Sequence, residues 1–208
     1  GITLIALATM YKKSIKGVFY FSLMSFSIAL WLFIQFIAQL RINEINDLFI
    51  VRLSSAASNL FPIFFLLFIT SYLKLTLPRK VYIATTGLFI ALIVSNFSTL
   101  MINKVDVTPY GIAVKETGIL YFIQIIANFS IFIFGLYKLY EISNKVSPTE
   151  KSRYRLLFFG IIQALLINVI GTTILLDSLL VQVVMVQSFL VMVGFVSYAI
   201  VKHKLFDI

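Results

Sequence analysis

The 208-residue sequence contains no cysteine and a single histidine, His203. Without cysteine the chain has no disulfides, thiol catalysis or thiolate metal sites. One histidine placed after the last apolar run cannot build a histidine metal site or a Ser-His relay within the apolar runs. There is also no glycine-rich phosphate loop ending in Lys-Ser or Lys-Thr, which excludes ATP-driven transport by this chain. We therefore expect no catalytic residues, no metal and no cofactor.

Charged residues are scarce. They make up 12% of the chain while hydrophobic residues make up 61%, whereas soluble domains are roughly one quarter charged. The excess of Lys and Arg gives a net charge of +9, which in a soluble protein would suggest a nucleic-acid partner. In a chain this apolar the positions of the charges matter more than their sum, and we expect the lipid bilayer to be the partner instead.

Seven apolar runs are present, and a helix of about 20 apolar residues crosses a bilayer. Six runs have that length, while the first has about half and is interpreted as the end of a longer helix. A signal peptide is the alternative for that first run, but it lacks the preceding basic residues. The expected spans are 1–11, 17–40, 48–72, 81–101, 118–140, 156–176 and 179–201. Connections are short, so we predict an all-α, polytopic seven-helix bundle forming one domain over 1–208.

Basic residues indicate the orientation. Thirteen of the 17 fall on one side of the predicted bundle: Lys12, Lys13, Lys16, Lys74, Arg79, Lys80, Lys138, Lys145, Lys151, Arg153, Arg155, Lys202 and Lys204. Because basic loops stay in the cytoplasm, we predict an outer N-terminus and a cytoplasmic C-terminus in a multi-pass protein of the cell membrane. The seventh run has no lysine for a retinal Schiff base, so rhodopsin chemistry is excluded.

Two local patterns modify this simple picture. Between the fourth and fifth spans, alternating apolar residues flank Pro109 and Gly111, which favours a small outer β-hairpin over an irregular loop. Pro62 lies near the middle of the third span, where its missing N–H should loosen the helix. That position is either a ligand-sensitive hinge or a static kink.

Large polar side chains within the spans indicate the bundle interior, because lipid-facing positions disfavour them. Most lie in the predicted outer half, which favours a pocket entered from outside or from the outer leaflet. The alternative is that they only join helices. For Arg52 the alternatives to an anionic ligand are lipid phosphates or a nearby carboxylate. The ligand-binding candidates are Gln35, Gln39, Arg52, Asn59, Gln124, Asn128, Asn168, Gln182 and Gln187.

Several motifs occur in an order that resembles the seven-helix N-terminal sensor region of prokaryotic membrane histidine kinases. They are Ala29-Leu-Trp31, Asn59-Leu-Phe-Pro62 with the run to Tyr72, Thr108-Pro-Tyr-Gly111, Arg153-Tyr-Arg155, Asn168, and Tyr198-Ala-Ile-Val-Lys-His-Lys-Leu-Phe-Asp-Ile208. The resemblance implies a signal-transducing receptor of a two-component system, sensing an external or membrane-dissolved small molecule, lipid or peptide. It also implies homodimerisation through a cytoplasmic kinase region that would follow residue 208.

The seventh span continues past Gly194 without a Pro or Gly break, so it can transmit a movement. We expect Pro62, Ser197, Leu205, Phe206 and Asp207 to carry the signal. Two other classes remain open from the residues alone. A small transporter or permease would show internal repeats and several broken helices. A ligand-free membrane scaffold would fill its polar faces with neighbouring helices.

Overall fold

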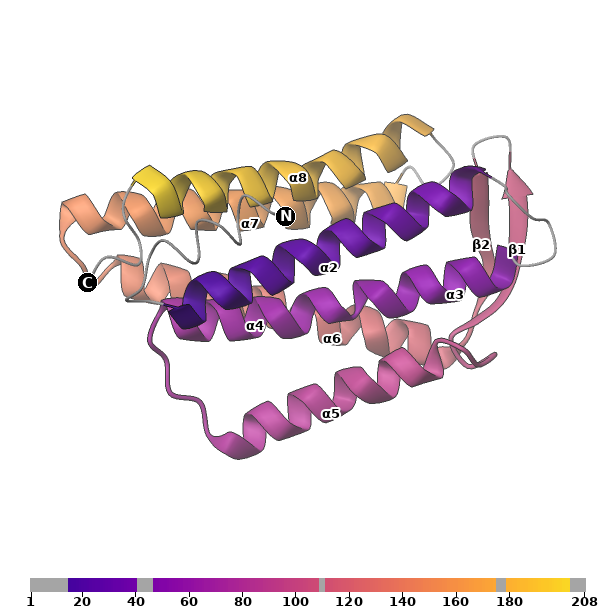
Figure 1. Ribbon diagram of the computed structural model, residues 1–208, viewed down its shortest axis with the longest axis horizontal. Helices are drawn as coiled ribbons and strands as arrows, with labels where there is room; N and C mark the ends of the chain where they lie inside the picture. The colour runs from indigo at the N-terminus through magenta and orange to yellow at the C-terminus, as the bar shows by residue number, and fades with distance from the viewer. Residues whose placement is uncertain (1–14, 41–46, 109–110, 175–178, 203–208) are drawn as a thin grey trace.

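The computed structural model describes residues 15–40, 47–108, 111–174 and 179–202. Within these ranges the chain forms seven helices and one two-stranded sheet (Figure 1). In chain order they are α2 (Ile15–Leu40), α3 (Asp47–Ser58), α4 (Leu60–Tyr72), α5 (Arg79–Ser95), β1 (Ile102–Thr108), β2 (Gly111–Thr117), α6 (Ile119–Ser143), α7 (Pro148–Ile174) and α8 (Leu179–Lys202). The expected first span, 1–11, lies outside the described residues.

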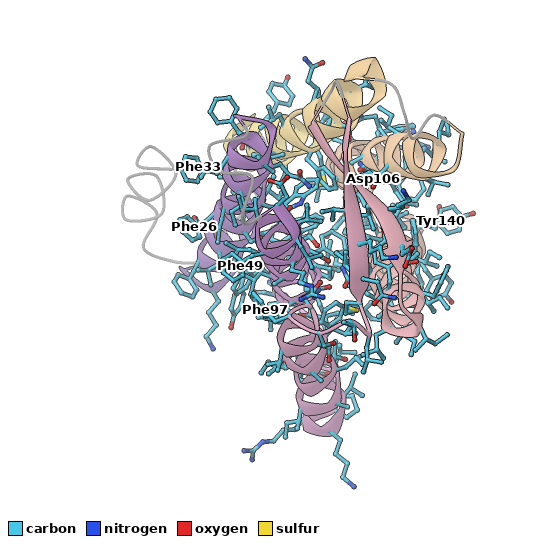
Figure 2. All side chains as sticks on the ribbon, turned by 90° about the vertical axis from the view of Figure 1, so that its right-hand side faces the viewer. Phe26, Phe33, Phe49, Phe97, Asp106 and Tyr140 are labelled. Carbon is cyan, nitrogen blue, oxygen red and sulfur yellow. The ribbon has the colours of Figure 1, made fainter. Side chains whose placement is uncertain are left out.

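The helices run roughly parallel to one long axis and alternate in direction, with the hairpin at one end (Figure 1). Three described stretches are long and apolar enough to cross a membrane: Lys16–Ala38, Asp47–Tyr72 and Ile119–Ser143. Shorter apolar stretches cover Tyr154–Ile170 in α7 and Gln187–Ala199 in α8. Phe26 and Phe33 point outward from α2 (Figure 2) and are more than half exposed, as side chains facing lipid are.

The fourth span was predicted too long at its end. Helix α5 stops at Ser95, not at Met101. The amide Nδ2 of Asn96 donates to the Leu92 carbonyl at 2.8 Å, and the hydroxyl of Ser98 donates to the Ser95 carbonyl at 2.7 Å. These polar side chains bond back to the last turns, and the following residues turn toward the hairpin instead of continuing the helix. Apolar character alone did not reveal this stop.

The third span is interrupted one turn before Pro62. Helices α3 and α4 follow one another directly and are separated by Asn59. Because Pro62 has no N–H, the Ser58 carbonyl loses its usual helical donor. The Asn59 N–H bonds to the Ala56 carbonyl at 3.2 Å, a tighter turn, while its side-chain Nδ2 donates to the Ser55 carbonyl at 3.2 Å. The side chain thereby replaces the backbone donor that Ser55 would otherwise receive.

The predicted hairpin is present. Strands β1 and β2 pair antiparallel, from Ile102 opposite Thr117 to Thr108 opposite Gly111. The two residues of the turn lie outside the described residues. Two exposed ion pairs cross the strands: Lys104 with Glu116 at 3.0 Å, and Lys115 with Asp106 at 2.7 Å. The bond to Asp106 raises the pKa of Lys115, so this lysine remains charged at neutral pH.

The core is built from large side chains and a few close backbone approaches. Phe21, Phe65 and Ile69 are completely or almost completely buried between α2, α4 and their neighbours. A methyl group on Gly135 of α6 would lie 2.7 Å from the Phe65 ring, so α4 and α6 pack closely there. Small residues at such contacts allow helices to associate in lipid, where hydrophobic burial gives little drive.

Candidate functional site

Polar side chains of α3, of the α3–α4 junction and of α6 lie close together inside the bundle. The amide Nε2 of Gln124 on α6 lies 3.3 Å from the hydroxyl of Ser55 on α3. Ser55 also accepts the Asn59 amide through its carbonyl, so it joins the two amides. Asn128 lies one turn after Gln124 and shares its helix face. We refer to Ser55, Asn59, Gln124 and Asn128 as the polar cluster.

The polar cluster contains acceptors without a donor. Among the described residues, the carbonyl oxygens of the Asn59, Gln124 and Asn128 side chains are buried and make no hydrogen bond. The orientation of the Asn59 amide follows from its partner, because the Ser55 carbonyl can only accept. An acceptor left unsatisfied in a buried site costs about 1–3 kcal/mol. A group that donates hydrogen bonds would satisfy these oxygens.

The polar cluster lies in the half of the bundle nearest the hairpin. At 1.5 Å per residue, Gln124 and Asn128 are about 8 and 14 Å from the start of α6. Ser55 and Asn59 are about 12 and 18 Å from the start of α3, which begins at the same end (Figure 1). The Gln163 side-chain oxygen, near the middle of α7, is also buried and unpartnered within the described part of the chain.

A second polar contact joins α7 to α8. The Asn168 amide donates to the Ser188 hydroxyl at 2.9 Å and to the Ala164 carbonyl at 2.8 Å. Ser188 is buried and directly precedes Phe189. The contact fixes the position of α8 on α7 close to the Phe189 ring.

An aromatic cluster connects the polar cluster to α8. Phe61, two residues after Asn59, has its ring centroid 5.1 Å from that of Phe132 on α6 and 5.4 Å from that of Phe189 on α8. Trp31 of α2 packs edge-on against the same Phe189 ring at 5.4 Å. Four helices thus meet at these rings, and α8 contacts α4 through Phe61, two residues after the α3–α4 interruption.

Arg52 holds the hairpin to the bundle. Its Nε and Nη2 donate to the Ile102 carbonyl at 3.2 and 2.7 Å, and its Nη1 donates to the Phe97 carbonyl at 3.3 Å. Phe49, one turn earlier on α3, also contacts the Phe97 ring (Figure 2). These bonds go to backbone carbonyls, a kind of partner that the sequence did not reveal.

The remaining predicted residues are dispersed. Gln35 on α2 and Ser197 on α8 are half-buried, and Pro62 in α4 is buried. Gln187 on α8 is exposed. The structure joins Asn59 and Gln124 through Ser55, with Asn128 one turn along α6 from Gln124, and within the described residues no hydrogen bond joins them to Gln187. The side chains of Gln39 and Gln182, and all of Leu205, Phe206 and Asp207, lie outside the described residues.

Sequence reasoning missed Ser55 and the aromatic cluster. Ser55 was detectable as the residue four before Asn59, on the same helix face. The sequence gives no signal for the aromatic cluster, because no periodic pattern separates Phe61 or Phe189 from ordinary lipid-facing aromatics. For metals, the described residues contain no group of three or more His, Asp or Glu side chains arranged to hold an ion.

The arrangement defines a multi-pass membrane bundle with a polar interior cluster and a hairpin at one end. The whole chain, residues 1–208, matches the family described as the N-terminal 7TM region of histidine kinase. The chain therefore belongs to this family, and residues 1–208 are the 7TM sensor region of a histidine kinase. No curated protein and no solved structure matches the sequence. The family assignment favours the sensor over the transporter and scaffold alternatives.

Proposed function

We propose that this sensor region binds a ligand carrying hydrogen-bond donors at the polar cluster and passes the signal to α8 through Phe61 and Phe189. The observation that carries the proposal is the set of buried, unpartnered side-chain oxygens on Asn59, Gln124 and Asn128. These oxygens lie beside the interruption between α3 and α4, where the helical hydrogen bonding is already irregular.

The unpartnered groups determine which ligand heads are favoured. All three are acceptors, and the Asn59 Nδ2 is already occupied by the Ser55 carbonyl. A hydroxyl, amide or ammonium head would supply the missing donors, whereas a carboxylate would place acceptor against acceptor. Exposed apolar side chains on the surrounding helices would face lipid, so an amphiphile that partitions into the membrane would approach the site from the bilayer. Asn59 and Gln124 are buried, so binding would have to open the packing around them.

The relay follows from which elements touch. A donor bound to the Asn59 Oδ1 pulls on the same side chain whose Nδ2 completes the α3–α4 junction, and Phe61 lies half a turn further on. Any rotation of this junction displaces the Phe61 ring against Phe189 of α8. Ligand binding would then favour one position of α8, which is how a ligand shifts a two-state equilibrium.

The proposed orientation places the hairpin outside and the free end of α8 in the cytoplasm. In the described residues, Lys74, Arg79, Lys80, Lys151 and Arg155 occur at the end opposite the hairpin, in agreement with the rule that basic segments stay inside. A ligand would enter from the exterior or the outer leaflet. Homodimerisation through a cytoplasmic kinase region remains part of this proposal.

Decyl compounds that differ only in the head group test the binding step. Decanol and decanamide should raise the melting temperature of the purified chain in nanodiscs. They should also change the fluorescence of Trp31, the single tryptophan of the chain. Decyl methyl ether and decanoate should produce neither change. The shift should disappear in Asn59→Leu and Gln124→Leu. Asn96→Leu is the matched control, because Asn96 is equally buried and has an unpartnered side-chain oxygen away from the polar cluster. Equal shifts with the ether and the alcohol would contradict the proposal.

The relay requires a separate measurement. In the histidine kinase that carries this region, Phe189→Leu should leave the decanol-induced rise in melting temperature intact but uncouple it from autophosphorylation. Leu190→Ala is the control, because Leu190 is an exposed neighbour on α8. If Phe189→Leu responds like the wild type, the aromatic cluster is not the route.

A further inference from the structure

A groove of about 310 Å³ lies where α6 ends and α7 begins, at the opposite end of the bundle from the hairpin. Its lining comes from the last turn of α6 and the first three turns of α7: Tyr140, Ser143, Asn144, Lys151, Arg155, Phe158 and Phe159. We propose that this groove binds the phosphate of an anionic phospholipid. The site is distinct from the polar cluster and does not depend on the function proposed for it.

The groove carries positive charge. Lys151 and Arg155 are four residues apart on α7 and share one helix face. Among the described side chains, no acidic residue lines the groove and neither cation is paired with a carboxylate. An arginine fork together with a lysine ammonium is a suitable pair of ligands for a phosphate.

The nearest described acid on α6 is already neutralised. Glu141 bonds Lys138 at 2.8 Å and Lys145 at 2.7 Å through its two carboxylate oxygens. This carboxylate therefore does not compete with an incoming phosphate for Lys151 or Arg155. The three side chains together carry a net charge of +1, which adds to the positive field at this end of the bundle.

The order of side chains along α7 matches the order of groups in a phospholipid. The two cations come first, and Phe158 and Phe159 follow about 5–6 Å deeper along the helix. Phe159 and Tyr140 are both more than half exposed, and Tyr140 projects outward from the bundle (Figure 2). Rings beside the cations would contact the glycerol backbone and acyl chains, which a free phosphate ion does not have.

The test compares lipid retention by matched variants. The purified full chain is placed in nanodiscs of phosphatidylcholine with one fifth phosphatidylglycerol, extracted into neutral detergent, and analysed by native mass spectrometry for bound lipid. We expect the wild type to retain phosphatidylglycerol and Lys151→Gln/Arg155→Gln to bind it about 30-fold more weakly. Arg79→Gln/Lys80→Gln removes two exposed cations from the same end outside the groove, and should retain the lipid.

Three outcomes would overturn the proposal. The first is a wild type that retains no phosphatidylglycerol, and the second is an equal loss in both double variants, which would indicate general surface charge. The third is displacement of the lipid by millimolar glycerol phosphate or inorganic phosphate, which would assign the groove to a free phosphate. Equal melting temperatures of both double variants in pure phosphatidylcholine nanodiscs show that a loss of lipid does not come from unfolding.

Discussion

Arg52 allows the sharpest test of the structure, because its role differs from every role that an intramembrane charge suggested beforehand. Its guanidinium donates to the carbonyls of Ile102 and Phe97 and so attaches the base of the hairpin to α3. Arg52→Met removes all three bonds while keeping a long apolar stem. Arg52→Lys keeps the charge but cannot form the two-nitrogen contact to one carbonyl.

The expected magnitude follows from those bonds. A hydrogen bond to a charged group contributes about 1.5–3 kcal/mol, but such bonds are not additive and the charge itself is costly near the bilayer. We expect Arg52→Met to lower the free energy of local opening at the hairpin base by about 2 kcal/mol, which corresponds to about 30-fold faster exchange. Arg52→Lys should fall between the wild type and the methionine variant.

Amide hydrogen exchange in nanodiscs measures this effect at two positions. The N–H of Gly118 donates to the Met101 carbonyl at 2.9 Å, and the N–H of Leu120 donates to the Leu100 carbonyl at 3.1 Å. Both acceptors lie in the segment between the two carbonyls that Arg52 holds. Protection of these two amides should decrease while amides in the middle of α6 stay protected. Unchanged exchange at Gly118 and Leu120 would refute the structural role and return Arg52 to the ligand-binding candidates.

Four further substitutions test backbone geometry through the melting temperature. Gly118→Ala should destabilise the protein by about 2 kcal/mol or more, because the added methyl would lie 2.2 Å from a backbone carbonyl oxygen. Gly87→Ala is the control, because no atom lies within 4 Å of its added methyl, and it should be neutral or stabilising. Gly135→Ala should cost about 1 kcal/mol, because the facing ring in α4 can tilt away; a cost equal to that of Gly118→Ala would contradict this difference. Lys74→Gly should raise stability by about 1 kcal/mol, because Lys74 follows the end of α4 with a φ of 51°, a conformation that glycine adopts without strain. A lower melting temperature of this variant would show that no strain is relieved.

The approximate helix positions were predictable because a bilayer requires a spanning backbone to be helical. A backbone in lipid must satisfy its hydrogen bonds internally, so every long apolar run becomes a helix. The hairpin was predictable for a local reason, the alternation of apolar residues around Pro109 and Gly111. The end of α5 was not, because Asn96 and Ser98 terminate the helix by bonding to their own backbone, and such residues occur within spans as well.

The candidate site was only partly predictable. The spacing of Gln124 and Asn128 placed them on one face, but the helix that this face meets is set by tertiary packing. Arg52 bonds residues 45 and 50 positions away, and no short-range pattern contains that information. The effect of Pro62 was expected at the proline itself, whereas its missing N–H acts one turn earlier, at Asn59.

The energetics of the polar cluster are of the size that a sensor requires. Moving a two-state equilibrium from 1:99 to 99:1 takes about 5.5 kcal/mol of differential binding. Each buried acceptor left without a donor costs about 1–3 kcal/mol, and the cluster contains three such side-chain oxygens. A ligand that satisfies two or three of them in only one packing of the α3–α4 junction would supply a difference of that order. The Asn59 side chain would accept from the ligand through Oδ1 while its Nδ2 holds the α3–α4 junction. Ligand binding would therefore act directly on the element that contacts α8 through Phe61.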